Sequence, residues 1–201
     1  MKKYLKWIIC FISLIIFIIL GIFVLTKNDI YIDSIVYNFI SRYISDDLTS
    51  ILKILTNLSG TIIVILITLL VLLFHKNKKY GLFMAIDLIT ITIFQYVLKF
   101  TFLRVRPENI NLIEETGYSF PSGHSLTAMA FYGFIIYLIQ ISKLNKKSKN
   151  LYTSLFSLII LIVGFSRVYL GVHFFTDVIA AFSFSISFLI IYTHLIKNYL
   201  K

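Results

Sequence analysis

Charged residues are scarce in this sequence. They make up 14% of its 201 residues, whereas an ordinary soluble domain carries about 25%. Apolar types reach 59%, and a single domain of this length has no core large enough to hide them. The composition therefore excludes a soluble protein, and it predicts one membrane-embedded domain over residues 1–201.

Cysteine and proline are scarce as well. Cys10 is the single cysteine and lies inside the first apolar run, which excludes a disulfide framework. The two prolines, Pro107 and Pro121, fall in the same connecting loop. The net charge of +10 is typical of a protein that meets anionic lipids or an anionic substrate. Nucleic acid is not an expected partner, because the chain has no polar basic domain.

Long apolar runs, in contrast, are abundant, and a helix needs about 20 residues to cross the hydrocarbon core. Six runs reach or approach this length, at about 4–26, 51–74, 80–102, 124–141, 151–169 and 175–196. The first begins with basic residues, but it is longer than the apolar region of a secretion signal and no small-residue cleavage site follows it. We therefore expect an all-α integral membrane protein with six transmembrane helices, the first of them retained.

The positive charges predict how these helices cross the membrane. If the N-terminus is cytoplasmic, twelve of the nineteen Lys and Arg residues fall in short connections and tails on the cytoplasmic side, as the positive-inside rule expects. These are Lys2, Lys3, Lys6, Lys76, Lys78, Lys79, Lys143, Lys146, Lys147, Lys149, Lys197 and Lys201. The seven Lys and Arg residues on the outer side include every arginine of the chain. They are Lys27, Arg42, Lys53, Lys99, Arg104, Arg106 and Arg167. Both termini are thus expected in the cytoplasm, and the outer arginines need a reason other than topology.

A further helix is predicted between the first two spans, over 30–45. Apolar residues recur there at helical spacing, with Asp33, Asn38 and Arg42 on the other side. The apolar positions are Ile32, Ile35, Val36, Phe39, Ile40 and Tyr43. This pattern indicates a short amphipathic helix that either lies on the outer leaflet or packs over the helix bundle.

Three stretches on the outer side carry polar groups. His173 and Asp177 are four residues apart, so both face one side of a helix that starts near His173. The carboxylate can then accept the Nδ1 proton and leave Nε2 free as a base or nucleophile. A capping or surface His–Asp pair without chemistry has the same spacing and is the alternative.

Lys99, Arg106 and Arg167 place positive charge at the same level. Guanidinium groups match phosphate oxygens bidentately, which favours a phosphoryl-binding role. The alternative is snorkelling, in which each cation only reaches for lipid headgroups. We expect Arg104 to do no more than that.

The third stretch, SFPSGHS, leads into the fourth span. Ser122 lies near the expected N-cap, where free backbone N–H groups bind anions. His124 stands beside that anion site and can give a proton to a leaving oxygen. An ordinary turn with an interfacial histidine is the alternative. Because three separate connections bring such groups to one level of the membrane, we favour a phosphate site.

Three acidic residues fall outside this pattern. Glu114 and Glu115 are adjacent in a loop and are expected to be solvated. Asp87 falls inside the third span, about 18 Å along a helix from Lys99, which is too far to touch the phosphate site. We expect an interhelical or cytoplasmic-side hydrogen bond for Asp87, with a role in lipid passage as the alternative.

The three stretches together resemble the type 2 phosphatidic acid phosphatase family, the membrane-bound lipid phosphate phosphatases. The family pattern is K-x6-RP, then PSGH, then SR-x5-H-x3-D, and residues 99–107, 121–124 and 166–177 match it in order and spacing. The motif region covers 99–177, and the six-span layout extends the resemblance over nearly the whole chain.

The resemblance implies a mechanism without metal or cofactor. His173 is implied to be the nucleophile that forms a phosphohistidine, Asp177 to orient it, and His124 to protonate the leaving oxygen. The phosphate-binding groups are implied to be Lys99, Arg106, Ser122, the Gly123 backbone and Arg167. No HExxH motif points to a metal instead.

A lipid phosphate or diphosphate is the substrate that the resemblance implies, at the extracytoplasmic face of a bacterial plasma membrane. Hydrolysis of undecaprenyl diphosphate to the monophosphate is favoured over phosphatidylglycerophosphate or phosphatidate. A vanadate haloperoxidase has a similar site, but those enzymes are larger and soluble. A non-enzymatic lipid-binding protein with a degenerate site is a further alternative. Nothing in the sequence indicates an oligomeric state.

Overall fold

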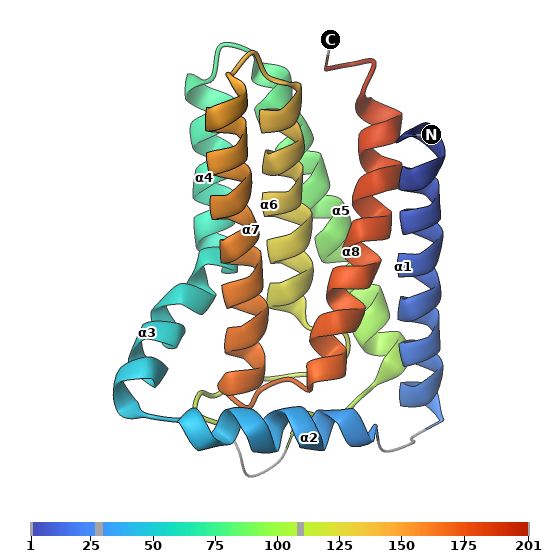
Figure 1. Cartoon of the computed structure of the whole chain (residues 1–201), viewed down its shortest axis with the longest axis vertical. Helices are drawn as coiled ribbons and strands as arrows, with labels where there is room; N and C mark the ends of the chain where they lie inside the picture. The colour runs from blue at the N-terminus through green and yellow to red at the C-terminus, as the bar shows by residue number, and fades with distance from the viewer. Residues whose placement is uncertain (1, 27–29, 108–110, 201) are drawn as a thin grey trace.

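The computed structural model describes residues 2–26, 30–107 and 111–200, and these residues form a bundle of helices (Figure 1). In chain order the helices are α1 (Lys2–Leu25), α2 (Tyr31–Ile40), α3 (Asp46–Thr56), α4 (Thr61–Phe74), α5 (Lys78–Phe102), α6 (Gly123–Ile141), α7 (Lys146–Tyr169) and α8 (Phe175–Ile196). Two 3-10 turns, η1 (Ser41–Tyr43) and η2 (Asn57–Ser59), follow α2 and α3. No strand occurs in these ranges, so the predicted all-α class is confirmed.

Five of the helices are each long and apolar enough to cross a membrane, namely α1, α5, α6, α7 and α8. A sixth span exists only if α3 and α4 count as one, because the pair is bent by 46° at Gly60, which follows η2. The run predicted as a span over 51–74 therefore forms two helices that meet at a bend. The chain is a multi-pass membrane protein, and the count of six stays a prediction.

The break between α3 and α4 coincides with polar side chains that bond the backbone. Asn57 Nδ2 donates to the carbonyl of Lys53 at 3.0 Å, and Ser59 Oγ donates to that of Thr56 at 3.3 Å. These bonds satisfy carbonyl groups where the helical ladder is interrupted. Gly60 fits the turn because a Cβ there would lie only 2.9 Å from the carbonyl oxygen of Asn57.

The short helix α2 lies across the ends of α7 and α8, transverse to the spans (Figure 1). The helix predicted within 30–45 therefore forms, but one polar residue faces the opposite way from the expectation. Asp33 is 5% exposed and points into the bundle, while the apolar Ile35 is exposed. The cause is a partly buried partner, Arg104, which binds the carboxylate. α2 thus packs over the bundle, and its position on the outer leaflet stays a prediction.

α6 lies at the centre of the bundle, in contact with α5, α7 and α8. Small residues on its surface permit close helix contacts. Ala128 is fully buried, and a Cβ at Gly133 would lie 2.5 Å from the Leu189 side chain of α8. This central position brings the PSGH segment, 121–124, into the interior of one end of the bundle.

The two ends of the bundle differ in what they carry. Both termini and the α4–α5 and α6–α7 turns lie at one end, and α2 with the segments after α5 and α7 lies at the other (Figure 1). The three motif stretches thus meet at the same end, as the topology predicts. Two cations of the charge count, Lys27 and Lys201, lie outside the described residues.

Candidate active site

His173 lies in the tight connection between α7 and α8. Gly171 takes a φ of +72° there, which side-chain-bearing residues rarely adopt, and this lets the chain reverse sharply. The Phe174 N–H donates to Asp177 Oδ2 at 2.9 Å and anchors the first turn of α8. The imidazole of His173 is left 3% exposed, between Asp177 and Arg106.

Two contacts determine which nitrogen of His173 is available for chemistry. Arg106 Nη1 lies 3.2 Å from Nε2, and Asp177 Oδ2 lies 3.4 Å from Nδ1. A guanidinium can only donate, so Nε2 accepts and the proton resides on Nδ1, facing the carboxylate. The Nε2 lone pair is therefore directed toward the cationic side of the site.

The surroundings keep the imidazole of His173 neutral. Burial lowers its pKa to about 4, the hydrogen bond and charge of Asp177 oppose that shift, and Arg167 and Arg106 add to it. Because this pKa lies well below 7, Nε2 carries a free lone pair at neutral pH, which is the nucleophilic form.

Asp177 is fully buried, and its two oxygens have separate partners. Oδ1 accepts from Arg104 Nη1 at 2.6 Å, and Oδ2 accepts from Ser119 Oγ as well as from a backbone N–H. The Ser119 hydroxyl also lies 3.3 Å from His173 Nδ1. The expectation that Arg104 only reaches for lipid headgroups is therefore wrong, and Ser119 is a site residue that the motifs did not indicate.

Arg167, in the last turn of α7, is fully buried and incompletely bonded. Nη1 donates to Thr56 Oγ1 at 3.0 Å, and Nη2 donates to Glu115 Oε1. Within the described part of the chain, its Nε has no hydrogen-bond partner. A buried guanidinium donor without a partner is suited to an oxygen of a bound anion.

Arg106 is fixed by the backbone around it. Its Nε donates to the Gly117 carbonyl at 2.9 Å, its Nη2 to the Thr116 carbonyl at 2.9 Å, and its Nη1 to the Val172 carbonyl at 2.8 Å. Three carbonyl groups thus fix the position of the guanidinium beside His173. Such rigidity lowers the cost of ordering the group when an anion binds.

Glu115 connects the two arginines, so the prediction that it is solvated is wrong. Its side chain is 25% exposed, its Oε1 accepts from Arg167, and its Oε2 lies 3.7 Å from Arg106 Nη2. Burial raises the pKa of Glu115, but Arg167, His124 and Arg106 outweigh burial and hold that pKa below its usual range. An ionised carboxylate therefore bridges the cations. The neighbouring Glu114 is exposed, as predicted.

Lys99 and His124 are the remaining charged or titratable side chains that the sequence predicts for the site. Lys99 lies in the last turn of α5 and His124 in the first turn of α6, and both are partly buried. Each interacts electrostatically with Arg167 and Glu115. We call three cations of the site the phosphate clamp, after the role that the sequence predicts for them: Lys99, Arg106 and Arg167.

Ser122 and Gly123 form the start of α6. Ser122 is the N-cap residue, as predicted, but its Oγ accepts from Ser125 Oγ at 3.0 Å and its N–H donates to the Asp177 carbonyl at 3.2 Å. A Cβ at Gly123 would lie 2.6 Å from Gln95 of α5. Glycine therefore lets α5 and α6 approach each other at this point.

Asp87 takes no part in this site. It is fully buried in α5, and neither carboxylate oxygen has a hydrogen-bond partner among the described residues. The predicted interhelical hydrogen bond is therefore wrong. The Tyr192 hydroxyl, which interacts electrostatically with Asp87, donates instead to the Phe83 carbonyl at 2.6 Å.

A neutral imidazole, an orienting carboxylate and a cluster of cations thus share one end of a membrane bundle, which is the arrangement of a phosphoryl-transfer site. The sequence matches the PAP2 superfamily over residues 78–201, and the chain belongs to this superfamily. Membership confirms the resemblance predicted from the three motifs.

Two relatives have names that bear on function. Phosphatidylglycerophosphatase B of Bacillus subtilis is 41% identical over 112 residues, which span only 55% of this chain and 55% of that protein. Undecaprenyl-diphosphatase of Sulfolobus acidocaldarius is 29% identical over 190 residues, which span 90% of this chain and 85% of that protein. Both names are those of phosphatases, which confirms the predicted enzyme class, a lipid phosphatase.

Two solved structures share the fold. A transmembrane PAP2 type phosphatidylglycerolphosphate phosphatase from Bacillus subtilis superposes with a TM-score of 0.81 and 26% identity, covering 92% of this chain and 96% of that one. LpxE of Aquifex aeolicus superposes with a TM-score of 0.68 and 20% identity, covering 83% and 97%. The second likeness concerns the fold alone.

Proposed function

We propose that the protein hydrolyses undecaprenyl diphosphate to the monophosphate at the extracytoplasmic face of a bacterial plasma membrane. The observation that carries the proposal is the orientation of His173, with Nδ1 facing Asp177 and Nε2 facing Arg106 of the phosphate clamp. The substrate is suggested by the relative named undecaprenyl-diphosphatase, which aligns with 90% of this chain.

Phosphatidylglycerophosphate is the second candidate substrate. The higher identity, 41%, to the Bacillus protein named phosphatidylglycerophosphatase B favours it, and so does the 0.81 TM-score to the structure named for that activity. Both lipids present a terminal phosphate, so the same clamp serves either. They differ in the leaving group, which is a phosphate oxygen in one and an alkoxide in the other.

The reaction proceeds in two displacements. Nε2 of His173 attacks phosphorus, the bond from phosphorus to the leaving oxygen breaks, and His124 gives that oxygen a proton. Water then attacks the phosphohistidine and gives a proton back to His124. The phosphorus–nitrogen bond breaks and inorganic phosphate leaves. Asp177 stabilises the imidazolium that exists between the two displacements.

The phosphate clamp stabilises the charge that develops on the phosphoryl oxygens. Fixed donors aimed at the transition state do not need to reorganise when the charge moves, which is the main source of catalysis in phosphoryl transfer. The Nε of Arg167 supplies a donor that no described residue occupies. Ser122 and the Gly123 N–H add donors at the start of α6, and Glu115 has to leave the arginines when phosphate enters.

The proposed orientation rests on the lysines. Twelve of the fifteen lysines fall in the two tails and in the α4–α5 and α6–α7 connections. These segments lie at the end of the bundle opposite to the site (Figure 1). A reporter enzyme that works only in the cytoplasm should therefore be active when it is fused to the C-terminus. Activity of a periplasmic reporter at that position would reverse the orientation.

The function is tested by phosphate release from purified protein in detergent with a chelator present. Undecaprenyl diphosphate, phosphatidylglycerophosphate and phosphatidate form the panel, and the ratio of their kcat/KM values decides between the two candidate substrates. Release from at least one lipid, undiminished by the chelator, is expected. A protein that releases phosphate from none of them would contradict the proposal.

His124→Ala is expected to slow hydrolysis of the phosphate monoesters more than that of the diphosphate. A diphosphate has a good leaving group that needs little protonation, whereas an alkoxide needs a general acid, a difference worth about 10²-fold. The measurement is kcat on both substrate classes. His75→Ala, an exposed histidine at the opposite end, is the matched control. Equal losses on both classes would argue against the acid role.

Glu115→Gln is expected to tighten the binding of inorganic phosphate about tenfold, which corresponds to about 1.4 kcal/mol. The reason is that the ionised Glu115 competes with phosphate for Arg167 and Arg106. The inhibition constant of phosphate in the hydrolysis assay measures this change. Glu114→Gln removes the same charge from the exposed neighbour and should have little effect. Equal effects of the two variants would show that only the net charge of the loop matters.

A further inference from the structure

Arg104 lies outside the phosphate clamp, yet it is bonded to the carboxylate that orients His173. The chain turns at Leu103, where α5 ends with a φ of +49°, and this turn directs Arg104 across the end of the bundle. Nη1 donates to Asp177 Oδ1 at 2.6 Å and to Thr176 Oγ1 at 2.9 Å. Nη2 donates to Asp33 Oδ2 at 2.8 Å.

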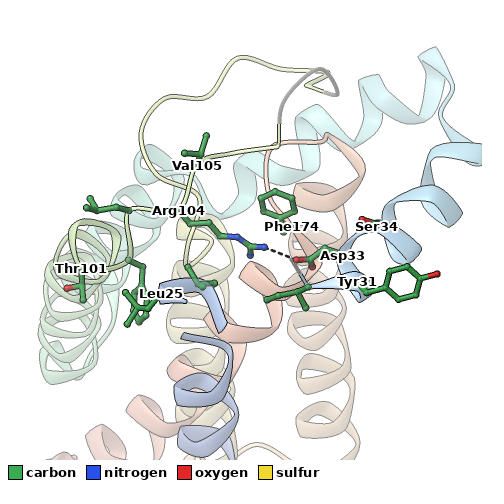
Figure 2. Close-up of a pocket in the computed structure, with 12 residues that line it drawn as sticks. Leu25, Tyr31, Asp33, Ser34, Thr101, Arg104, Val105 and Phe174 are labelled. Carbon is green, nitrogen blue, oxygen red and sulfur yellow. Dashed lines mark hydrogen bonds and ion pairs between the residues drawn. The ribbon is translucent and has the colours of Figure 1, made fainter. Parts of the chain in front are cut away.

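Asp33 joins α2 to the start of α8. Its Oδ1 accepts the Thr176 N–H at 2.8 Å, and its Oδ2 accepts the Thr176 hydroxyl at 2.7 Å. A carboxylate from α2 thus takes up one of the free N–H groups at the beginning of α8, where negative charge is favourable. Figure 2 shows Arg104 pointing toward Asp33, with Phe174 nearby. The Phe174 ring centroid lies 3.9 Å from the guanidinium carbon.

Burial makes these three charges depend on one another. The side chains of Asp177, Asp33 and Arg104 are 0%, 4% and 15% exposed. Ionised hydrogen bonds in such surroundings are short and strong, and the loss of one partner leaves a buried charge uncompensated. Arg104 binds Oδ1 of Asp177, whereas His173 meets Oδ2. The carboxylate therefore cannot turn Oδ2 away from the imidazole without breaking its bond to Arg104.

We propose that Arg104 and Asp33 are positioning residues for the reaction. Asp33 on α2 holds Arg104, Arg104 holds Asp177, and Asp177 keeps the proton of His173 on Nδ1. The kinetic part of this inference rests on the proposed function. Docking of α2 across the end of the bundle then completes the orientation of the nucleophile, although no residue of α2 belongs to the phosphate clamp.

Arg104→Ala is expected to lower kcat about 10²-fold, because a small misplacement of a reacting group has an effect of that size. KM should change by less than about threefold, since Arg104 is bonded to carboxylates and does not contribute to the clamp. Asp33→Asn preserves shape and should give an intermediate loss of kcat. Arg42→Ala, an exposed arginine on η1, is the matched control and should behave like the parent.

The cavity in Figure 2 permits a chemical test of position. It measures about 1100 Å³ and is lined by Arg104, Asp33, Leu25 and Thr101 among others. Guanidinium ion added to Arg104→Ala can enter beside the two carboxylates, and it is expected to restore kcat in a saturable manner without changing the parent enzyme. A folded Arg104→Ala variant that keeps the parental kcat, or that guanidinium does not restore, would overturn the inference.

Nitrogen-15 NMR of histidine-labelled protein gives a readout that needs no substrate, because the chain has only four histidines. The parent should show His173 with its proton on Nδ1, and Asp33→Asn should show a mixture of tautomers. If Arg104→Ala does not fold, Asp33→Asn carries the test. If the variant shows a tautomer shift and the parent protein hydrolyses no lipid, the positioning role is supported and the proposed function is contradicted. An unchanged tautomer in an active enzyme overturns the positioning role alone.

Discussion

Replacement of His173 by alanine is expected to slow phosphate release by at least about 10³-fold, because the covalent path through a nucleophile is lost. The imidazole is 3% exposed and its neutral Nε2 faces the phosphate clamp. In the variant only the clamp remains, which can bind phosphate but provides no group to attack phosphorus. The inhibition constant of inorganic phosphate should therefore stay within a few fold of the parental value.

The measurement is a single-turnover rate with enzyme in excess over lipid, so that product release does not mask the chemical step. His75→Ala provides the control for loss of a histidine far from the site. Thermal unfolding in detergent shows whether the His173 variant is folded. Parental activity in folded His173→Ala would exclude the nucleophile assignment, whatever the substrate.

Arg167→Lys is expected to lower kcat by about 10²- to 10³-fold, although it keeps the positive charge. Lysine has no planar fork and cannot provide both the Nη1 bond to Thr56 and the Nε donor that no described residue occupies. The loss should appear mainly in kcat, because the clamp has to stabilise charge that develops in the transition state.

Variants of Arg167 and Glu115 together distinguish the effect of the charge at position 167 from that of the guanidinium geometry. In Arg167→Met the bridging carboxylate is left facing the site with one cation fewer, so binding of phosphate should also weaken. Combining Arg167→Met with Glu115→Gln restores the charge balance, and it should recover binding of inorganic phosphate but not kcat. Recovery of kcat in the double variant, or a parental kcat in Arg167→Lys, would show that the fork geometry is not required.

The run lengths of apolar residues predicted the spans well where the runs are unbroken. α1, α5, α6, α7 and α8 each correspond to one predicted run, because a helix across a membrane has to satisfy its backbone internally. The run over 51–74 forms two helices, α3 and α4, that meet at a bend of 46°. Asn57 and Ser59, which bond nearby carbonyls, lie just before this bend. Both polar residues were visible in the sequence, but whether they bend a helix depends on their neighbours in space.

The motif spacings predicted which groups meet at the site, but not the partners of the remaining charges. Asp33 and Arg104 are 71 residues apart and form a partly buried ion pair. The local pattern around each residue indicates a polar helix face for Asp33 and lipid headgroups for Arg104, because such a pattern contains no information on distant partners. Acidic residues are few, nine in all. When an acidic and a basic residue lie in connections at the same end of the bundle, the sequence therefore indicates that they form an ion pair.

Glu115 shows the same limit at the site itself. Adjacent acidic residues in a loop are usually solvated, and Glu114 is. Glu115 differs because the loop folds back over the two arginines, and the fields of these arginines more than offset the cost of burying the carboxylate. No local pattern distinguishes the two residues, since the difference arises from the path of the loop.

The central claim, that His173 takes the phosphoryl group from a lipid, is tested most directly by trapping the intermediate. Enzyme mixed with radiolabelled lipid substrate is quenched in alkali within milliseconds, and the labelled peptide is mapped by mass spectrometry. We predict label on a nitrogen of His173 that appears before free phosphate and disappears as phosphate is released. Label on another residue, or phosphate release in a single turnover with no labelled histidine at any time point, would contradict the account.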